Sequence, residues 1–149
     1  MRTKNTYAFP VNREHIVKVS YDESPAHVAR LKYAIDFIVP EGTPVKATAA
    51  GTVIDLQDGS EIGGTEKKFE ELGNFIEIRR ANGEYSEYEH LKKGSLVKPG
   101  DKVKKGQIIG YSGATGWIAN LGPHLHFMVG IYGKTIREYK TLEIVFEKQ

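Results

Sequence analysis

The residues best suited to chemistry are His124 and His126, two histidines separated by one residue in an apolar stretch. On a β-strand, side chains two positions apart point to the same face and lie about 7 Å apart. One imidazole can therefore bind a metal ion while the other stands beside a water on that metal. Two polar residues on a solvated strand face would give the same pattern, because a short motif is weak evidence by itself.

Asp36 is the next residue of interest because it interrupts an apolar run, with Ile35 and Phe37 beside it. A carboxylate buried in such a strand is costly unless it is paired or binds a cation. A salt bridge to a lysine would satisfy it, and a metal ion would serve equally well. His27 precedes it in the loop-like stretch Ser24-Pro-Ala-His27. Taken alone, His27 is more often a surface histidine than a ligand.

His90 adds a further imidazole, at the end of a stretch that reads as a strand. Tyr88 and His90 share one face of that strand, so His90 is expected to point into the same cleft. Nitrogen and oxygen ligands without sulfur suit Zn²⁺, and three protein ligands plus a water mark a catalytic site. The sequence has no His-Glu-x-x-His helix, so a histidine must take the role of the general base.

Composition bounds the class of protein. The 149 residues fit one domain, 1–149, with a core over about 7–145, and 40% hydrophobic and 27% charged residues are ordinary for a globular chain. The absence of cysteine excludes disulfides, thiolate metal sites and cysteine nucleophiles. A net charge of +2 gives no argument for a nucleic-acid partner. No apolar run is long enough to cross a bilayer, and the N-terminal residues do not read as an export segment.

The elements that must position these residues are β-strands. Short runs rich in Val, Ile, Tyr and Phe alternate with glycine and proline, without βαβ alternation. Strands are expected at residues 33–39, 52–56, 74–79, 84–91 and 124–131, a turn and short strand at 97–110, and a last hairpin after Gly133. Asn82-Gly83 predicts a tight turn, and residues 58–73 are expected to form a mobile loop with one helical turn. The pattern favours an all-β antiparallel sandwich or barrel with little helix.

Taken together, these residues resemble the lysostaphin/LytM-type zinc metallopeptidases over nearly the whole chain, from about Tyr7 to Val145. Each matching piece is weak alone, but all stand in the order that the family has. The pieces are Ser24-Pro-Ala-His27, Tyr33-Ala-Ile-Asp-Phe-Ile-Val-Pro-Glu-Gly-Thr-Pro-Val45, Ala50-Gly-Thr-Val53, Gly73-Asn-Phe75, Tyr88-Glu-His-Leu91 and Gly122-Pro-His-Leu-His-Phe127.

The resemblance implies a duplicated-hybrid-motif fold and one Zn²⁺ per chain, held by His27, Asp36 and His126. It also implies that His124 is the general base and that His90 orients the metal-bound water and stabilises the oxyanion. The division of roles between His124 and His126 rests on the resemblance alone.

The usual substrate of the family is the peptide cross-link of the bacterial cell wall, and the cleft would be walled by residues 58–73 and 113–120. Trp117 and Asn74 are the candidate substrate-binding residues, although Trp117 could equally be a packing residue. A cell-wall substrate would place the protein outside the cell or in the periplasm. The sequence leaves the compartment, the cleaved bond and the oligomeric state open.

Two other functions compete with a peptidase. A catalytically inactive member of the family would bind or regulate a partner, but such relatives lose metal ligands that this chain retains. A biotinyl- or lipoyl-like carrier domain is suggested by Val97-Lys-Pro-Gly-Asp-Lys-Val-Lys-Lys-Gly-Gln-Ile-Ile109. A carrier needs a lysine on a tight turn, typically beside methionine, and the sequence has no Met-Lys pair.

Overall fold

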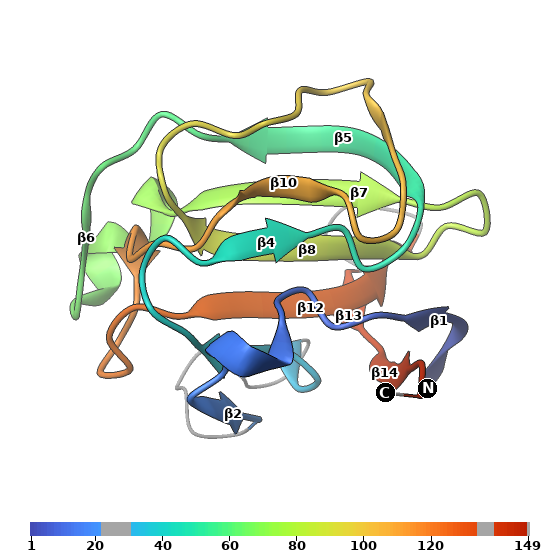
Figure 1. Cartoon of the computed structure of the whole chain (residues 1–149), viewed down its shortest axis with the longest axis horizontal. Helices are drawn as coiled ribbons and strands as arrows, with labels where there is room; N and C mark the ends of the chain where they lie inside the picture. The colour runs from blue at the N-terminus through green and yellow to red at the C-terminus, as the bar shows by residue number, and fades with distance from the viewer. Residues whose placement is uncertain (22–30, 134–138, 149) are drawn as a thin grey trace.

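The computed structural model describes residues 1–21, 31–133 and 139–148, which form an antiparallel β fold (Figure 1). An eight-stranded sheet runs in the order β2-β3-β12-β8-β7-β5-β9, with β13 paired to β12. Its strands are β2 (Lys18–Ser20), β3 (Ile35–Ile38), β5 (Gly51–Gln57), β7 (Asn74–Arg79), β8 (Tyr85–Leu91), β9 (Lys102–Val103), β12 (Leu125–Ile131) and β13 (Lys140–Thr141). The expected all-β antiparallel class is therefore confirmed, and each of the five expected strands overlaps one of these.

Three two-stranded sheets complete the fold. They pair β4 (Pro44–Lys46) with β10 (Ile108–Tyr111), β6 (Gly63–Gly64) with β11 (Gly116–Trp117), and β1 (Arg2–Tyr7) with β14 (Glu143–Phe146). Two short 3₁₀ helices, η1 (Arg13–His15) and η3 (Lys67–Leu72), are the helical elements of the described residues. In the same part of the chain, no helix is long and apolar enough to cross a membrane.

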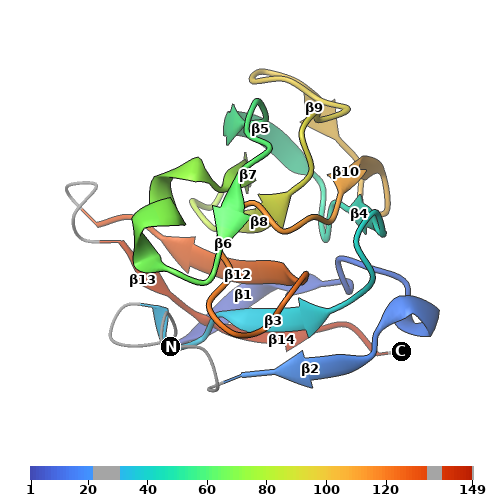
Figure 2. The same ribbon diagram turned by 90° about the vertical axis from the view of Figure 1, so that its left-hand side faces the viewer.

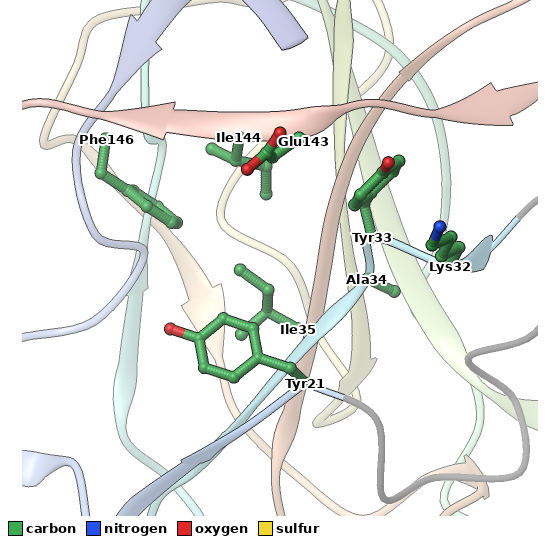
Figure 3. Close-up of a pocket in the computed structure, with 8 residues that line it drawn as sticks. All are labelled: Tyr21, Lys32, Tyr33, Ala34, Ile35, Glu143, Ile144 and Phe146. Atoms are coloured by element: carbon green, nitrogen blue, oxygen red, sulfur yellow. The ribbon is translucent and has the colours of Figure 1, made fainter. Parts of the chain in front are cut away.

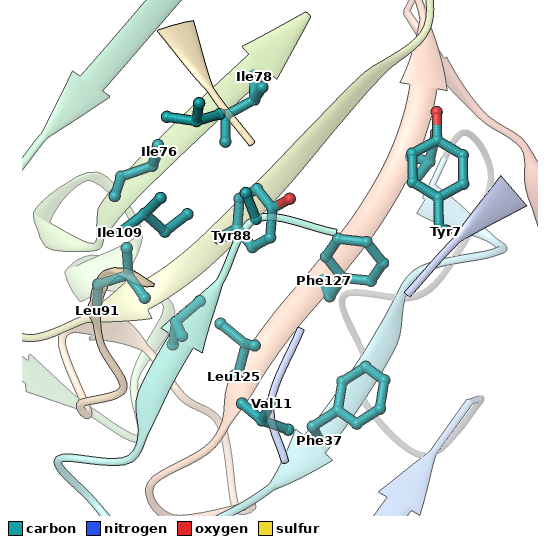
Figure 4. Packing of buried hydrophobic residues seen from close by; sticks show 14 of the residues in the cluster. Tyr7, Val11, Phe37, Ile76, Ile78, Tyr88, Leu91, Ile109, Leu125 and Phe127 are labelled. Atoms are coloured by element: carbon teal, nitrogen blue, oxygen red, sulfur yellow. The ribbon is translucent and has the colours of Figure 1, made fainter. Parts of the chain in front are cut away.

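The hydrophobic core lies between the large sheet and the β4–β10 pair, which covers one face of it (Figures 1 and 2). Leu125 and Phe127 of β12 project into this core and are fully buried. Figure 4 shows them with Ile76 of β7 and Ile109 of β10. Because side chains alternate along a strand, the residues between these core positions point to the opposite face of the sheet. That opposite face carries the candidate site.

Residues 58–73 and 113–120 are joined to one another at one end of the large sheet, where β8 ends and β12 begins (Figure 1). Gly63 and Gly64 pair in parallel with Gly116 and Trp117. A Cβ on Gly63 would lie 1.8 Å from the carbonyl oxygen of Ala114, so only glycine permits this approach. The expected helical turn falls within η3, which with six residues makes about two 3₁₀ turns. Mobility of the segment stays a prediction.

Candidate metal centre and active site

Four side chains form a row across adjacent strands on the face opposite the core. Ser20 of β2 lies opposite Asp36 of β3, Asp36 lies opposite His126 of β12, and His126 lies opposite Glu89 of β8. Residues directly opposite each other in antiparallel strands have Cβ atoms about 4.5–5.5 Å apart on the same face. Strand register therefore brings Asp36 and His126, which are distant in sequence, into one cluster.

Asp36 is completely buried, and its carboxylate contacts both histidines of the His-x-His pair. Its Oδ1 atom lies 3.2 Å from Nδ1 of His126 and 3.5 Å from Nε2 of His124. Both imidazoles are buried, so the cluster is largely removed from bulk water. The expected link between a costly buried carboxylate and the histidine pair is therefore present in the structure.

The two predicted ligands in the described residues fit a zinc site. Two atoms bound to one tetrahedral zinc at about 2.0–2.1 Å would be about 3.3 Å apart, and Asp36 Oδ1 and His126 Nδ1 are 3.2 Å apart. A hydrogen bond from the imidazole to the carboxylate has the same length. His27, the third predicted ligand, lies outside the described residues. Within residues 1–21, 31–133 and 139–148, no group of three or more potential ligands forms a complete metal site.

His126 stands between two carboxylates. Besides its contact with Asp36, its Nε2 atom is 3.5 Å from Oε2 of Glu89. Burial acts to lower the pKa of His126, but the charge of Glu89 and the hydrogen bond and charge of Asp36 outweigh it, and the pKa is raised. The cluster therefore favours positive charge at this imidazole, as it would favour a cation bound there.

His124 and His90 are held in the same tautomer by backbone carbonyls. Nδ1 of His124 lies 2.8 Å from the carbonyl oxygen of Gly122, and Nδ1 of His90 lies 2.7 Å from that of Thr115. A carbonyl can only accept, so each Nδ1 must carry the proton. In the neutral rings Nε2 is then a hydrogen-bond acceptor and a base, and in His124 this atom faces Asp36.

The position of His90 corrects one prediction from sequence, because Tyr88 and His90 do not share a strand face. The Tyr88 hydroxyl is buried on the core side against Thr48. The His90 ring instead lies 4.6 Å from that of His124 and 5.9 Å from that of His126, measured between centroids. His90 has φ of +67° where the β7–β8 register shifts, so a bulge turns its side chain to the site.

The environment of His90 keeps its imidazole neutral. Burial, followed by the nearby charges of His124 and His126, lowers its pKa to about 3. A left-handed backbone is uncommon for a residue with a bulky side chain, and such strain is often found at functional sites. The bulge and the Thr115 hydrogen bond therefore present a neutral imidazole to the other histidines, with the proton on Nδ1 and the acceptor lone pair on Nε2.

Asn74 anchors the loop next to the site. It is completely buried, its Nδ2 donates to the carbonyls of Ser60 and Leu91, and its Oδ1 accepts the N–H of Ser60. Its own N–H donates to the hydroxyl of Thr115. A direct contact between Asn74 and a substrate would require these hydrogen bonds to open. Its binding of substrate stays a prediction, and the structure shows it fixing the segment that holds His90.

Replacement of Asn74 by alanine should lower the free energy of unfolding by about 1–3 kcal/mol, because buried carbonyls would lose their donors. Chemical denaturation measures the change. Asn120 is exposed, so Asn120→Ala is the control and should change stability by less than about 0.5 kcal/mol. Equal small effects of the two substitutions would contradict the anchoring role.

Trp117 is partly buried and joins the two candidate cleft walls. Its indole N–H donates to the carbonyl of Thr65, 3.2 Å away. The ring therefore has a packing role, and its contact with a substrate stays a prediction.

A pocket of about 390 Å³ lies away from the histidine cluster, between β3 and β14 (Figure 3). Ile35 lines this pocket. Because successive residues of a strand face opposite ways, the side chain of Asp36 points away from it. The described residues that line it are Tyr21, Lys32, Tyr33, Ala34, Ile35, Glu143, Ile144 and Phe146, and none of these is a predicted site residue.

Further along the site face, Glu87 of β8 is surrounded by other carboxylates. Burial raises its pKa well above the ordinary value, and the charges of Glu89, Glu77 and Asp55 raise it further. A raised carboxyl pKa means that the folded state holds the proton more tightly than the unfolded state. Stability is therefore lost as the pH rises from about 4.3, the ordinary pKa of glutamate, toward the folded pKa.

Glu87→Gln should consequently stabilise the protein at pH 7.5, by about 0.5–2 kcal/mol as for other surface-charge improvements. The gain should shrink as the pH falls to 4, where Glu87 is protonated in the folded state and mostly protonated in the unfolded state. Urea unfolding of both proteins at the two pH values measures this difference. A gain independent of pH would show that ionisation of Glu87 is not its cause.

Comparisons with known proteins identify the family and the fold. The family model described as Peptidase family M23 matches residues 30–138. The peptidoglycan DD-endopeptidase ShyA of Vibrio cholerae is 32% identical over 136 residues, which cover 89% of this chain and 29% of that protein. Lysostaphin of Staphylococcus simulans is 42% identical over 98 residues, 65% of this chain and 17% of that protein. The chain thus spans less than a third of the length of these relatives.

Solved structures show the same fold. A zinc containing peptidase from Vibrio cholerae aligns with a TM-score of 0.66 at 26% identity, over 97% of this chain and 41% of that one. A mutant catalytic domain of the prophage-encoded M23 protein EnpA from Enterococcus faecalis aligns with a TM-score of 0.61 at 28% identity. That alignment covers 85% of this chain and 88% of that one.

The fold and the family match define the class as an M23-type peptidase domain. The chain belongs to peptidase family M23, and its resemblance to lysostaphin/LytM-type proteins is confirmed.

Proposed function

We propose that this chain is a zinc-dependent endopeptidase, with one Zn²⁺ held by His27, Asp36 and His126. The observation that carries the proposal is the buried contact of Asp36 with both His126 and His124. Oxygen and nitrogen donors of this kind suit zinc, and metalloprotease is the name given to a relative from Haemophilus influenzae. When bound, the metal would lower the pKa of a water and polarise the carbonyl of the cleaved bond.

His124 is the proposed general base. Its Nδ1 proton is held by the Gly122 carbonyl, so Nε2 is the atom that receives a proton from the attacking water. The same atom, once protonated, can deliver that proton to the departing amine. His124 faces the carboxylate of Asp36, which stabilises the imidazolium formed between the two transfers.

His90 is proposed to orient the attacking water. It remains neutral, and its Nδ1 proton is used by Thr115, so Nε2 can accept a hydrogen bond from that water. A neutral His90 in this tautomer has no second N–H to offer an oxyanion. The geometry therefore supports the water-orienting part of its predicted role.

The proposed substrate is a peptide cross-link of peptidoglycan. Support comes from relatives named as a peptidoglycan DD-endopeptidase and, in Neisseria meningitidis, as a DD-carboxypeptidase/endopeptidase. Trp117 lies where the two candidate cleft walls meet and is the proposed substrate contact.

The test is hydrolysis of a panel of cross-linked muropeptides and glycine-rich peptides, with products identified by mass spectrometry. The zinc-loaded chain should cleave a wall peptide, lose activity with a chelator, and regain it when zinc is returned. Cleavage of general proteins but not of wall peptides would overturn the proposed peptidoglycan substrate but not the proposed zinc-dependent hydrolysis of peptide bonds. Zinc-loaded protein that cleaves neither would overturn the proposed activity and favour a binding module.

A further inference from the structure

Glu89 is a residue of the site face that the sequence patterns did not single out. It lies directly opposite His126 in the β8–β12 register, and its carboxylate is 3.5 Å from His126 Nε2. The other ring nitrogen of His126, Nδ1, is 3.2 Å from Asp36. The imidazole therefore lies between two carboxylates, and each ring nitrogen faces one of them.

This arrangement matches a common way of supporting a metal-binding histidine. One ring nitrogen binds the metal and the other donates its N–H to a carboxylate, which fixes the tautomer and makes the ligand more basic. In His126, Nδ1 faces the proposed ligand Asp36, so Nε2 is the outer nitrogen and Glu89 is the carboxylate that faces it.

We propose that Glu89 is a positioning residue that accepts the Nε2–H of His126 and so directs the Nδ1 lone pair to the metal. The inference rests on the proposed metal site. Glu89 acts through His126 and is not proposed to contact the substrate.

Two neighbouring carboxylates on the same face, Glu87 and Glu77, lie beside residues other than His126. Glu87 lies opposite Met128 in the β8–β12 register, and Glu77 accepts a hydrogen bond from the Tyr132 hydroxyl at 2.7 Å. Glu89 is the one of the three for which the described part of the chain shows an ion pair with His126. Its side chain is 31% exposed, but that of His126 is only 6% exposed. Glu89→Gln keeps an oxygen acceptor beside the buried ring, so this variant should fold even if Glu89→Ala is destabilised.

Glu87→Gln is a matched control for Glu89→Gln, because the two positions are on the same strand and the same sheet face. Zinc affinity is measured by competition with a chromogenic chelator for the wild type and for Glu89→Ala, Glu89→Gln and Glu87→Gln. Glu89→Ala should weaken zinc binding about 10–100-fold, the usual effect of losing such a partner. Glu89→Gln retains an oxygen acceptor without the charge, so its zinc affinity should lie between that of Glu89→Ala and that of the wild type. Glu87→Gln should bind like the wild type.

A second readout follows the tautomer directly. Nitrogen-15 NMR of the zinc-loaded wild type should show His126 protonated at Nε2 with the metal on Nδ1, and the Nε2 proton should exchange faster in Glu89→Ala. Equal zinc affinity of Glu89→Ala and Glu87→Gln, or metal bound through Nε2, would overturn the inference. A wild type that binds no zinc would instead overturn the proposed function, so the two failures are distinguishable.

Discussion

Replacement of His126 by alanine is expected to abolish both zinc binding and peptidase activity. The imidazole supplies one of the two ligand atoms placed 3.2 Å apart in the described structure. A metal contributes several kcal/mol to transition-state stabilisation, and about 1.4 kcal/mol corresponds to a factor of ten in rate. The loss in kcat/KM should therefore be about 1000-fold or more. Metal content after gel filtration and hydrolysis of a cross-linked muropeptide measure the two effects.

His15→Ala is the matched control, since it removes an imidazole outside the site. The side chain of His15 is 39% exposed and pairs with Glu14. This variant should retain zinc and activity within about twofold, because surface substitutions have small effects. Retention of one zinc per chain by His126→Ala would contradict its role as a ligand.

His124→Ala is expected to separate metal binding from turnover. The imidazole is placed to accept a proton through Nε2 and is anchored at Nδ1 by the Gly122 carbonyl. Loss of a general base typically costs about 10²–10⁴-fold in rate, so kcat should fall by that amount while zinc content stays at one per chain. Single-turnover kinetics on a muropeptide, with metal analysis of the same sample, provide the measurement.

His90→Ala is the comparison for this variant, because it removes a neighbouring imidazole that is proposed only to orient the water. It should slow turnover less than His124→Ala. Full activity of His124→Ala would refute the general-base assignment. Loss of zinc from His124→Ala would instead show that His124 takes part in binding the metal, a role that is proposed for His126.

The strands that carry the site could be predicted because their side chains alternate. Residues 74–79 were expected as a strand, and β7 spans Asn74–Arg79. Ile76 and Ile78 face the core while Glu77 faces the other side, which is the period-two pattern of a half-buried strand. Gly83 has φ of +89° in the turn between β7 and β8, as the Asn-Gly signal predicts.

The short and distant pairings could not be predicted in the same way. β6 and β11 contain two residues each, too few to show any periodicity. β1 pairs in parallel with β14 from the opposite end of the chain, and sequence patterns do not report which distant segments will pair. The β6–β11 pair joins the cleft walls, and the β1–β14 pair joins segments near the two termini. The arrangement of the cleft walls therefore could not be predicted from the sequence.

The site itself could be predicted by residue type but not by orientation. Asp36 was identified because it interrupts an apolar strand, and His124 and His126 were identified by their spacing. The register of β3 and β12 brings these residues together. The bulge at His90 breaks alternation, and no residue in Tyr88-Glu-His90 signals it. Glu89 was missed because its importance comes from lying opposite His126. Only the β8–β12 register, which the sequence does not report, reveals it.

The most direct test of the metal site is anomalous X-ray diffraction from crystals of the zinc-loaded protein, recorded on both sides of the zinc absorption edge. One strong peak per chain is expected, about 2.0–2.1 Å from Asp36 Oδ1 and from His126 Nδ1, with His27 as the third protein ligand. A peak bound elsewhere, or a zinc-loaded crystal without a peak at Asp36 and His126, would contradict the proposed metal site.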